Sequence, residues 1–252
     1  MKKVLLTALL ILSLVFVFSC GQTAKEETKK QETPAVQTFN FKDYFPLDTI
    51  TQNVLKWEYY ADGELQEVYF EAFEVKTEGG KKYLYDYMYK ENYEPDGLDI
   101  YEITDEGLIT YKLYTYSKGN PVEIAYSPQN FIFMPWVLKS DFSVEYTYSY
   151  TKYSENYKQN MTLNYKVKKF FDKPVKLTIL GKDYEGIQLK YSYSYSIKLE
   201  DGRSGSATYN GYVVFAKGFG FAEWRFAGKG WTDEMKIVEI IPYADFVKNL
   251  KK

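Results

Sequence analysis

The alternation of apolar and polar residues over positions 187–199 restricts the fold of this chain more than any other feature. Isoleucine, leucine and tyrosine occupy the odd positions, and glutamine, lysine and serine occupy the even ones. Successive side chains of a strand point to opposite sides of a sheet, so the pattern predicts a strand with one apolar face and one wet face. At about 3.3 Å per residue this strand would span roughly 40 Å, well beyond an average strand. We therefore expect it to curve around a core.

Other segments repeat this alternation and are separated by short turn signals. Residues 144–151 and 161–168 alternate in the same way, and residues 83–90 place four tyrosines on one face with Asp86 on the other. Asp62-Gly63 is typical of a tight turn between two strands. The connections are short enough for hairpins, and no helical crossovers lie between them. The sequence therefore predicts an all-β fold: a single-domain, curved antiparallel meander in the form of a half-barrel or open barrel.

Two segments depart from the strand pattern. Residues 126–138 contain Pro128 and Pro135 and alternate little, so we interpret them as a long apolar crossover packed over the sheet. Residues 243–250 have apolar side chains at helical spacing and predict a short C-terminal helix. These two segments are the ones free to act as lids or plugs on the concave side. If they only cover the concave side, a pocket remains beneath them. If either fills the concave side completely, side chains such as Trp136 are core and there is no pocket.

The first residues have the composition of an export signal. Two lysines precede an apolar run at residues 4–18, which is shorter than the ~20 residues that a membrane-spanning helix needs. A charged start, a short apolar segment and a small residue at its end are typical of a secretory signal. We therefore expect residues 1–19 to be a signal peptide. Residues 20–38, rich in Lys, Glu, Gln and Thr, are predicted to be a flexible tether, and residues 39–252 to be the antiparallel β domain.

The end of this signal carries the only cysteine of the chain. Val17-Phe18-Ser19-Cys20 resembles the lipobox of bacterial lipoproteins. The resemblance implies that Cys20 is diacylated on its sulfur and becomes the N-terminus of the mature protein. Such a protein would be anchored by lipid to a bacterial membrane, in the cell envelope and on the extracytoplasmic side. The alternative is an uncleaved transmembrane anchor with an incidental cysteine. An inner, an outer and a single membrane are all compatible with the segment.

Short motifs within the β domain resemble a family. Tyr44-Phe45-Pro46-Leu47, then Trp57-Glu58-Tyr59, and later residues 215–221 are similar to the "YFPL…WxY … YAKGVGLV" pattern of uncharacterised bacterial lipoproteins. Residues 180–185 are similar to a strand-turn-strand of the same proteins. The resemblance implies a curved antiparallel sheet, distantly like the LolA- and LolB-type half-barrel lipoprotein carriers. It implies no known reaction.

The composition disfavours several classes of chemistry. The chain has no histidine, and an acylated Cys20 offers no free thiol, so the commonest general base, thiol nucleophiles and the usual zinc ligands are missing. Arg203 and Arg225 are the only arginines, which disfavours nucleic-acid binding because guanidinium is the usual reader of phosphates and bases. We predict that the protein is not an enzyme and has no cofactor, metal site or nucleic-acid partner.

Paired carboxylates are the remaining candidates for catalysis. Glu71 and Glu74, or Asp96 and Asp99, could pair in space as they do in glycoside hydrolases. Charged side chains lie mostly on solvated surfaces. We therefore interpret these four residues as solvated strand and turn charges.

Tyrosine is the residue type in excess, with 27 copies. An apolar ring with a polar hydroxyl suits a cavity wall that meets an amphiphile, or a platform for sugar rings. The alternative is that the rings are cross-strand core pairs that stabilise the sheet. Arg225 could anchor an anionic head group or pair with a carboxylate such as Glu223. The candidate ligand-facing residues are Tyr146, Tyr148, Tyr191, Tyr193, Tyr195, Trp224 and Arg225. Ser192, Ser194 and Ser196 are expected on the solvent face of the strand.

Three functions fit these features. The leading one is a lipid-anchored, non-enzymatic module of the cell envelope that binds an amphiphilic or apolar ligand, such as a lipid or lipopeptide, or another envelope component, on a concave aromatic face. The second is an envelope scaffold that binds protein through a sheet face or edge. The third is a carbohydrate-binding surface lipoprotein. A cavity would favour the first over the second, and a row of exposed coplanar rings would favour the third.

Overall fold

The structure is a computed structural model that describes residues 35–154 and 156–250. The predicted signal peptide, Cys20 and most of the predicted tether lie outside these residues. Residues 36–252 form one compact unit. Its elements, in chain order, are β1 (Thr38–Asn40), the 3-10 helix η1 (Phe41–Asp43), α1 (Leu47–Ile50), β2 (Asn53–Ala61), β3 (Glu64–Glu78), β4 (Lys81–Lys90), β5 (Pro95–Ile103), β6 (Gly107–Ser117), β7 (Asn120–Glu123), β8 (Ala125–Ser127), β9 (Ile132–Pro135), β10 (Val137–Lys139), β11 (Ser143–Ser154), β12 (Gln159–Ile179), β13 (Lys182–Leu199), β14 (Ser204–Ala216), β15 (Gly220–Gly228), β16 (Trp231–Pro242) and α2 (Tyr243–Leu250).

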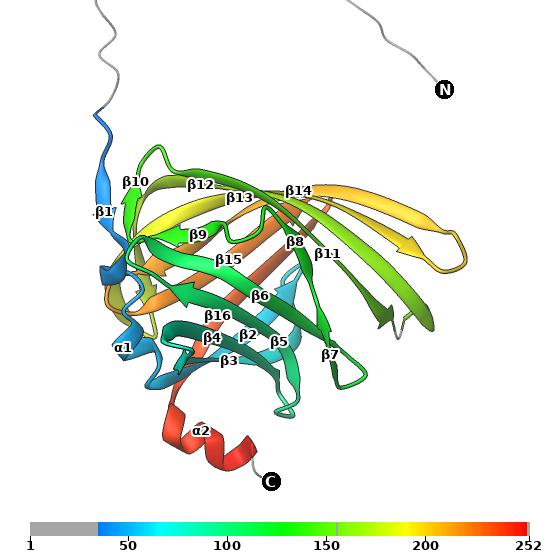
Figure 1. The fold of residues 1–252 in the computed structure, drawn as a ribbon, viewed down its shortest axis with the longest axis horizontal. Coiled ribbons are helices and arrows are strands. Elements are labelled where there is room, and N and C mark those ends of the chain that lie inside the picture. The colour runs from blue at the N-terminus through cyan, green and yellow to red at the C-terminus, as the bar shows by residue number, and fades with distance from the viewer. Residues whose placement is uncertain (1–34, 155, 251–252) are drawn as a thin grey trace, which may run out of the picture. The chain divides into compact units, whose positions relative to one another are not determined.

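Fourteen of the described strands form one large antiparallel sheet that nearly closes into a barrel (Figure 1), and β1 and β10 pair with each other in a separate two-stranded sheet. Neighbours along the sheet are β7-β6-β5-β4-β3-β2-β16-β15-β14-β13-β12-β11-β8, and β9 adds to β6. Strands β2 to β7 and β11 to β16 are each joined by hairpins, and β16 pairs with β2 to unite the two runs. This architecture confirms the predicted all-β, curved antiparallel fold.

The free edges of the sheet meet at a seam that side chains bridge. The Tyr126 hydroxyl of β8 lies 3.0 Å from the carbonyl oxygen of Thr110 and 2.8 Å from that of Tyr111, so it donates to the backbone of β6. The backbone N–H of Tyr153 on β11 donates to the Ser117 hydroxyl at 3.0 Å. These bonds satisfy backbone groups that a strand ladder would otherwise pair.

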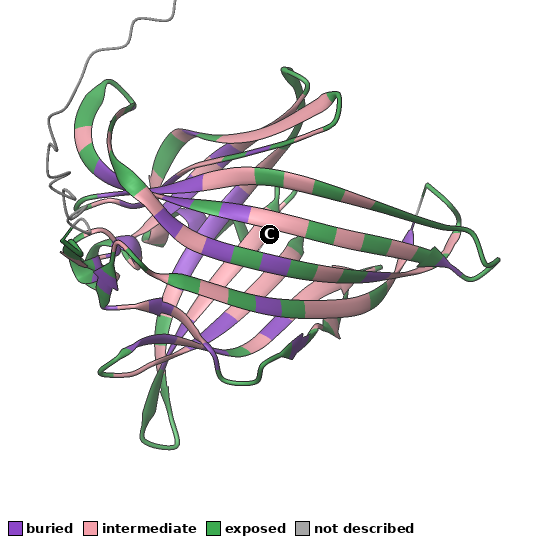
Figure 2. Cartoon of the chain, turned by 90° about the horizontal axis from the view of Figure 1, so that it is seen from above, coloured by how far each residue is buried: buried purple, intermediate pink, exposed green. Residues whose placement is uncertain are grey.

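The alternation over residues 187–199 lies on β13, as predicted, and Figure 2 shows buried and exposed bands alternating along such strands. The pairing of β12 with β13 shifts register between Phe171 and Lys173, an irregularity of the kind that bends a strand. Pro174 lies inside the continuous strand β12, at a position that pairs with β13 alone, since β11 pairs only as far as Phe170. A proline is tolerated there because its missing N–H interrupts no second ladder.

The predicted crossover closes one end of the barrel. It forms three short strands, β8, β9 and β10, and its Met134, Trp136 and Leu138 are buried in the main core. Gly107 allows β9 to come this close to β6, because an added Cβ would lie 2.2 Å from the Met134 carbonyl oxygen. The N-terminal segment packs beside it, with the Phe41 ring centroid 6.5 Å from that of Trp136 and the Phe41 N–H donating to the Trp136 carbonyl at 2.7 Å.

The predicted C-terminal helix is present as α2, but it is not a lid on the concave side. Its Phe246 is buried against the outer face of the sheet, with ring centroids 5.4 Å from Phe70, 5.4 Å from Tyr89 and 5.5 Å from Tyr93. The helix covers an outward-facing apolar cluster that also includes Val54 and Ala72. Among the described residues no helix is long and apolar enough to cross a membrane.

Candidate ligand-binding cavity

The barrel contains a partly open cavity of about 450 Å³, within the range of about 300–1,000 Å³ typical of small-molecule sites. Its walls are inward-facing side chains of β3 to β6 on one side and of β11 and β13 to β15 on the other. The crossover contributes Phe131 and Phe133, and the N-terminal segment contributes Phe45. The crossover therefore fills one end of the interior without eliminating the cavity.

One wall is aromatic, and we call its members Tyr146, Tyr148, Tyr191 and Tyr193 the tyrosine wall. The first two are on β11 and the last two are on β13. Alternate side chains of a strand point to the same side of the sheet, and in both strands the tyrosines are on the inner side. The Tyr146 ring stacks on Phe131 at 4.6 Å, and Tyr191 and Tyr193 stack at 5.7 Å. Burial raises the pKa of all four hydroxyls, so they stay neutral at physiological pH.

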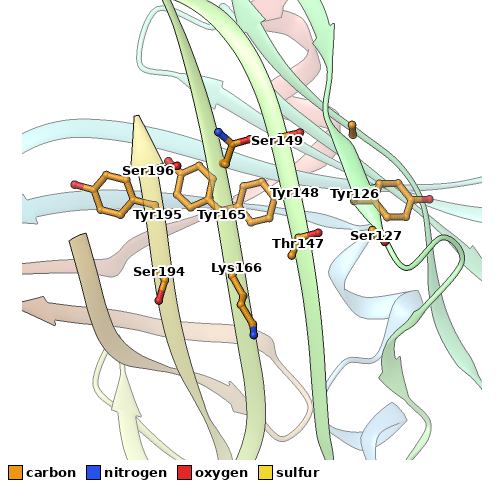
Figure 3. A pocket seen from close by; sticks show the side chains of 12 residues that line it. Tyr126, Ser127, Thr147, Tyr148, Ser149, Tyr165, Lys166, Ser194, Tyr195 and Ser196 are labelled. Atoms are coloured by element: carbon orange, nitrogen blue, oxygen red, sulfur yellow. The ribbon is translucent and has the colours of Figure 1, made fainter. Parts of the chain in front are cut away.

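Trp224 lines the same cavity from β15, and its ring lies 4.5 Å from Phe226. Tyr195 instead lines a more open pocket of about 510 Å³ (Figure 3). There Tyr195, Tyr165 and Tyr148 form a row, with ring centroids 5.7 Å and 4.4 Å apart. Tyr148 belongs to both pockets, so the row connects the cavity with the more open pocket.

Arg225 does not belong to the cavity, which corrects its place among the ligand-facing residues. It follows Trp224 directly on β15, so the two side chains point to opposite sides of the sheet. Arg225 is exposed and interacts with the hydroxyl of Tyr212, which also donates to Glu223 at 2.6 Å.

The opposite side of the cavity carries three carboxylates, Glu71, Asp86 and Asp99, which we call the acidic wall. Asp86 and Asp99 are direct partners in the pairing of β4 with β5. Asp86 pairs with Phe73 of β3 and Met88 pairs with Glu71, so Glu71 is a diagonal neighbour of Asp86. No ion pair joins any of these three carboxylates in the described part of the chain.

Hydrogen bonds hold two members of the acidic wall. The Trp57 indole N–H donates to Glu71 at 2.9 Å, and the Tyr101 hydroxyl donates to Asp99 at 3.1 Å. Glu71 is only 4% exposed. Asp86 and Asp99 are half-buried, because they face the cavity rather than bulk solvent.

The pKa of each carboxyl of the acidic wall is raised, chiefly by burial, which disfavours the charged form. Neighbouring carboxylates raise the pKa of Glu71 and Asp86 further. For Asp99 burial raises the pKa to about 6, against the lowering effect of the Tyr101 hydrogen bond. Each carboxyl of the acidic wall therefore holds its proton to a higher pH than an exposed carboxyl does.

A lysine lies in the interior beyond the tyrosine wall. Lys169 of β12 has no exposed surface, and its amine donates a hydrogen bond to the Phe133 carbonyl. Its Nζ lies 3.5 Å from the centroid of the Phe133 ring. Burial lowers the pKa of Lys169 well below its usual value. No ion pair between Lys169 and the acidic wall is present among the described residues.

The structure corrects the interpretation of Glu71 and Asp99 as solvated charges, whereas Glu74 and Asp96 are partly exposed and pair with lysines. Glu71 and Glu74 are three residues apart on β3 and face opposite sides, and Glu74 pairs with Lys76 at 3.1 Å on the outside. Asp86, Thr110 and Lys169 are interior residues that were not predicted from the sequence. A signal existed for Asp86, since it shares its strand face with Leu84 and Met88. Within the described residues no group of acidic, cysteine or histidine side chains is placed to hold a metal ion.

No protein-family model and no curated protein matches the chain. Three solved structures are similar to it. A candidate lipoprotein from Parabacteroides distasonis ATCC 8503 has 14% identity and a TM-score of 0.48, covering 78% of this chain and 97% of its own. A candidate exported protein with a YmcC-like fold from Bacteroides fragilis NCTC 9343 has 10% identity and a TM-score of 0.47, covering 75% and 95%. The hypothetical lipoprotein YmcC from Escherichia coli K12 has 12% identity and a TM-score of 0.34, covering 75% and 88%.

Two of these proteins are called lipoproteins and one is called exported, and those words describe the proteins themselves. At such identities and TM-scores the likenesses carry no argument about this chain's ligand or activity. The distant resemblance to LolA- and LolB-type carriers is not confirmed by them.

Proposed function

We propose that this protein is a lipid-anchored component of the bacterial cell envelope that binds an amphiphilic ligand inside its barrel and catalyses no reaction. The observation that carries the proposal is the cavity of about 450 Å³, which combines the tyrosine wall with a few polar groups. Ligand sites of this kind are mostly apolar, with few convergent polar groups that orient the ligand.

The anchoring part of the proposal is supported by the sequence of the export signal. An apolar run too short to span a bilayer ends at Ser19-Cys20, and the residues up to position 38 favour a flexible tether. Mass spectrometry of the membrane-extracted protein should identify an N-terminal peptide that begins at acylated Cys20. Cys20→Ala should release or mislocalise the protein. Recovery of an intact residue 1–19 segment from the membrane would refute the anchor.

The tyrosine row of Figure 3 supports a carbohydrate platform less well. Tyr148 and Tyr165 are nearly parallel, at an angle of 11° and a centroid distance of 4.4 Å, so they cover each other's faces. A sugar ring stacks on an open ring face. The geometry therefore favours an enclosed ligand over a surface sugar.

Thermal unfolding of residues 21–252 with amphiphiles of increasing chain length tests the binding. A ligand that binds only the folded state stabilises it by ~2.7 kcal/mol at a hundredfold excess over its dissociation constant. Leu113→Trp, which adds volume to the cavity wall, should abolish the shift, whereas Leu65→Trp at an outer position that is 52% exposed should preserve it. No stabilisation by any amphiphile would contradict the proposal.

A further inference from the structure

We propose that the cavity selects amphiphiles whose polar end is a cationic amine, and that Glu71, Asp86 and Asp99, together with Thr110, form the subsite for this amine. This inference rests on the proposed function and adds the chemistry of the ligand's head group. The amine would bind at the acidic wall, and the apolar chain of the ligand would lie against the rings of the tyrosine wall.

The first observation is the convergence of three acidic side chains on one part of the cavity. Directly opposite side chains in an antiparallel pair have Cβ atoms about 4.5–5.5 Å apart, and diagonal neighbours lie about 7–8 Å apart. Asp86 therefore lies beside both Asp99 and Glu71, within the reach of one ammonium group. Like charges directly opposite each other are destabilising. A cation placed among them would reverse the sign of that interaction.

The second observation is independent of the acidic wall. The Thr110 hydroxyl of β6 lines the same cavity, Thr110 is 1% exposed, and its oxygen has no hydrogen-bond partner among the described residues. Buried hydroxyls are nearly always hydrogen-bonded, since an unpaired one costs about 1–3 kcal/mol. Thr110 pairs in the sheet with Tyr101, whose hydroxyl donates to Asp99. An amine that donates to Asp99 could therefore also donate to the Thr110 oxygen.

The third observation is that, within residues 35–154 and 156–250, no lysine or arginine forms an ion pair with the wall. Lys169 donates to the Phe133 carbonyl instead, and the Phe133 ring lies 4.7 Å from the Tyr101 ring. The fourth carboxylate that lines the cavity, Asp96, pairs with Lys90 at 3.5 Å. The tyrosine wall and Trp224 line other parts of the cavity, and aromatic rings can attract ammonium groups. The described residues that line the cavity include no lysine or arginine, so an anionic head group would meet acidic or neutral side chains there.

The pH dependence follows from the groups that face the subsite. Burial raises the pKa of each carboxyl on β3, β4 and β5, that of Glu71 to about 8 and that of Asp99 to about 6, and it raises the pKa of Asp86 well above its usual value. Tyr101 and Tyr146 face the same space and stay neutral, since burial raises the pKa of both hydroxyls further. A cation favours the ionised carboxyls and displaces their protons. Binding of a cation should therefore strengthen as the pH rises from about 5 to about 8.

A matched ligand series tests the inference on residues 21–252 by isothermal titration calorimetry. The ligands are decyltrimethylammonium, decylamine, decanol and decanoate, which share one chain and differ in head group. We expect both cations to bind at least tenfold more tightly than decanol and decanoate at pH 8. Decyltrimethylammonium has no titrating proton, so its tighter binding at pH 8 than at pH 5.5 reports the protein carboxyls.

Variants locate the effect. Asp99→Asn and Glu71→Gln should each remove most of the preference for cations while leaving the affinity for decanol within about twofold. Glu74→Gln, on the outer face of the same strand, should change nothing. Thr110→Val is nearly isosteric and should weaken decylamine, which can donate a hydrogen bond, more than decyltrimethylammonium, which cannot. It provides a test even if a charge variant fails to fold.

The outcomes separate this inference from the proposed function. Equal binding of all four ligands would overturn the amine subsite and leave an amphiphile-binding cavity. Tighter binding of decanoate would also overturn it. Binding of none would refute the proposed function itself. Stabilisation by calcium chloride alone to the same extent as by decylamine, lost in Asp99→Asn, would make the wall a metal subsite and overturn the inference.

Discussion

Strands β4 and β13 carry the same tyrosine alternation, but they use it in opposite ways. On β13 the tyrosines point inward, and Tyr191 and Tyr193 line the cavity. On β4 the tyrosines point outward, and it is Leu84, Asp86 and Met88 that line the cavity. The same alternation of tyrosine with other residues thus places an aspartate on the interior face of β4 and tyrosines on the interior face of β13.

The difference follows from what covers the outer face of each strand. Outside β4, helix α2 places Phe246 against Tyr89, and Lys76 lies 4.3 Å from the Tyr85 ring, so the outer tyrosines have partners. Outside β13, Ser194 and Ser196 are exposed. The comparison teaches that a tyrosine face need not be the interior face when another element covers it.

Removal of the ring that covers the outer tyrosines should have the largest effect. Phe246→Ala should lower the free energy of unfolding by about 3–5 kcal/mol, the range for large aromatic deletions in cores. Urea unfolding measures this change. Asp245→Ala, on the same helix and paired with Lys248 at the surface, is the control and should change little. A small effect of Phe246→Ala would mean that α2 does not cover the sheet.

The tyrosine wall is tested next. Tyr193→Ala should cost about 3 kcal/mol or more, because its ring contacts Tyr209 at 4.9 Å and Phe226 at 5.0 Å. Ser194→Ala, which is exposed, should stay within about 0.5 kcal/mol. Comparable losses in the two variants would mean that β13 presents its other face to the interior.

The acidic wall should make the free energy of unfolding depend on pH. The folded pKa of Asp99, about 6, exceeds its ordinary value of 3.8. The folded state therefore binds protons more tightly, and the stability from this group is present below about pH 4 and lost as the pH rises through about 6. Asp99→Asn should raise the free energy of unfolding at pH 8 by at most about 3 kcal/mol, since one pKa unit is about 1.4 kcal/mol. Unfolding at pH 4 should show no gain, and an equal gain at both pH values would exclude titration as its cause.

The smallest expected effect concerns the buried charge beyond the tyrosine wall. Lys169→Met should stabilise the protein by about 1 kcal/mol at pH 7, because it removes a buried amine and loses one hydrogen bond. The folded pKa of Lys169 lies below its usual 10.5, so the folded state binds fewer protons than the unfolded state. Wild-type stability therefore rises with pH, and the advantage of the variant should shrink as the pH approaches 10.5. An advantage that does not change with pH would indicate a packing effect.

Much of the fold could be predicted from local patterns. The alternation predicted the strands, the turn residues predicted the hairpins, and the spacing of Phe246 and its neighbours predicted α2. Tyr146, Tyr148, Tyr191, Tyr193 and Trp224 were singled out as candidate ligand-facing residues, and the structure places all five on the cavity. Their binding of a ligand stays a prediction.

The acidic wall could not be predicted in the same way. Glu71, Asp86 and Asp99 lie on three strands and come together only through the register of β3, β4 and β5. Local sequence also favours a solvated position for any single carboxylate, because most carboxylates are solvated. The position of Arg225, in contrast, could have been predicted from local sequence. Neighbouring residues of a strand point to opposite sides, so a cavity-facing Trp224 places Arg225 on the outside.

The sequence by itself determined the period of each strand, the turns between strands and the presence of two faces, because these depend on neighbours along the chain. The tertiary structure decided which face of each strand is interior. That choice depends on closure of the sheet and on what α2 and the crossover cover. Period-two alternation is symmetric with respect to inside and outside, so only packing between distant segments can break the symmetry.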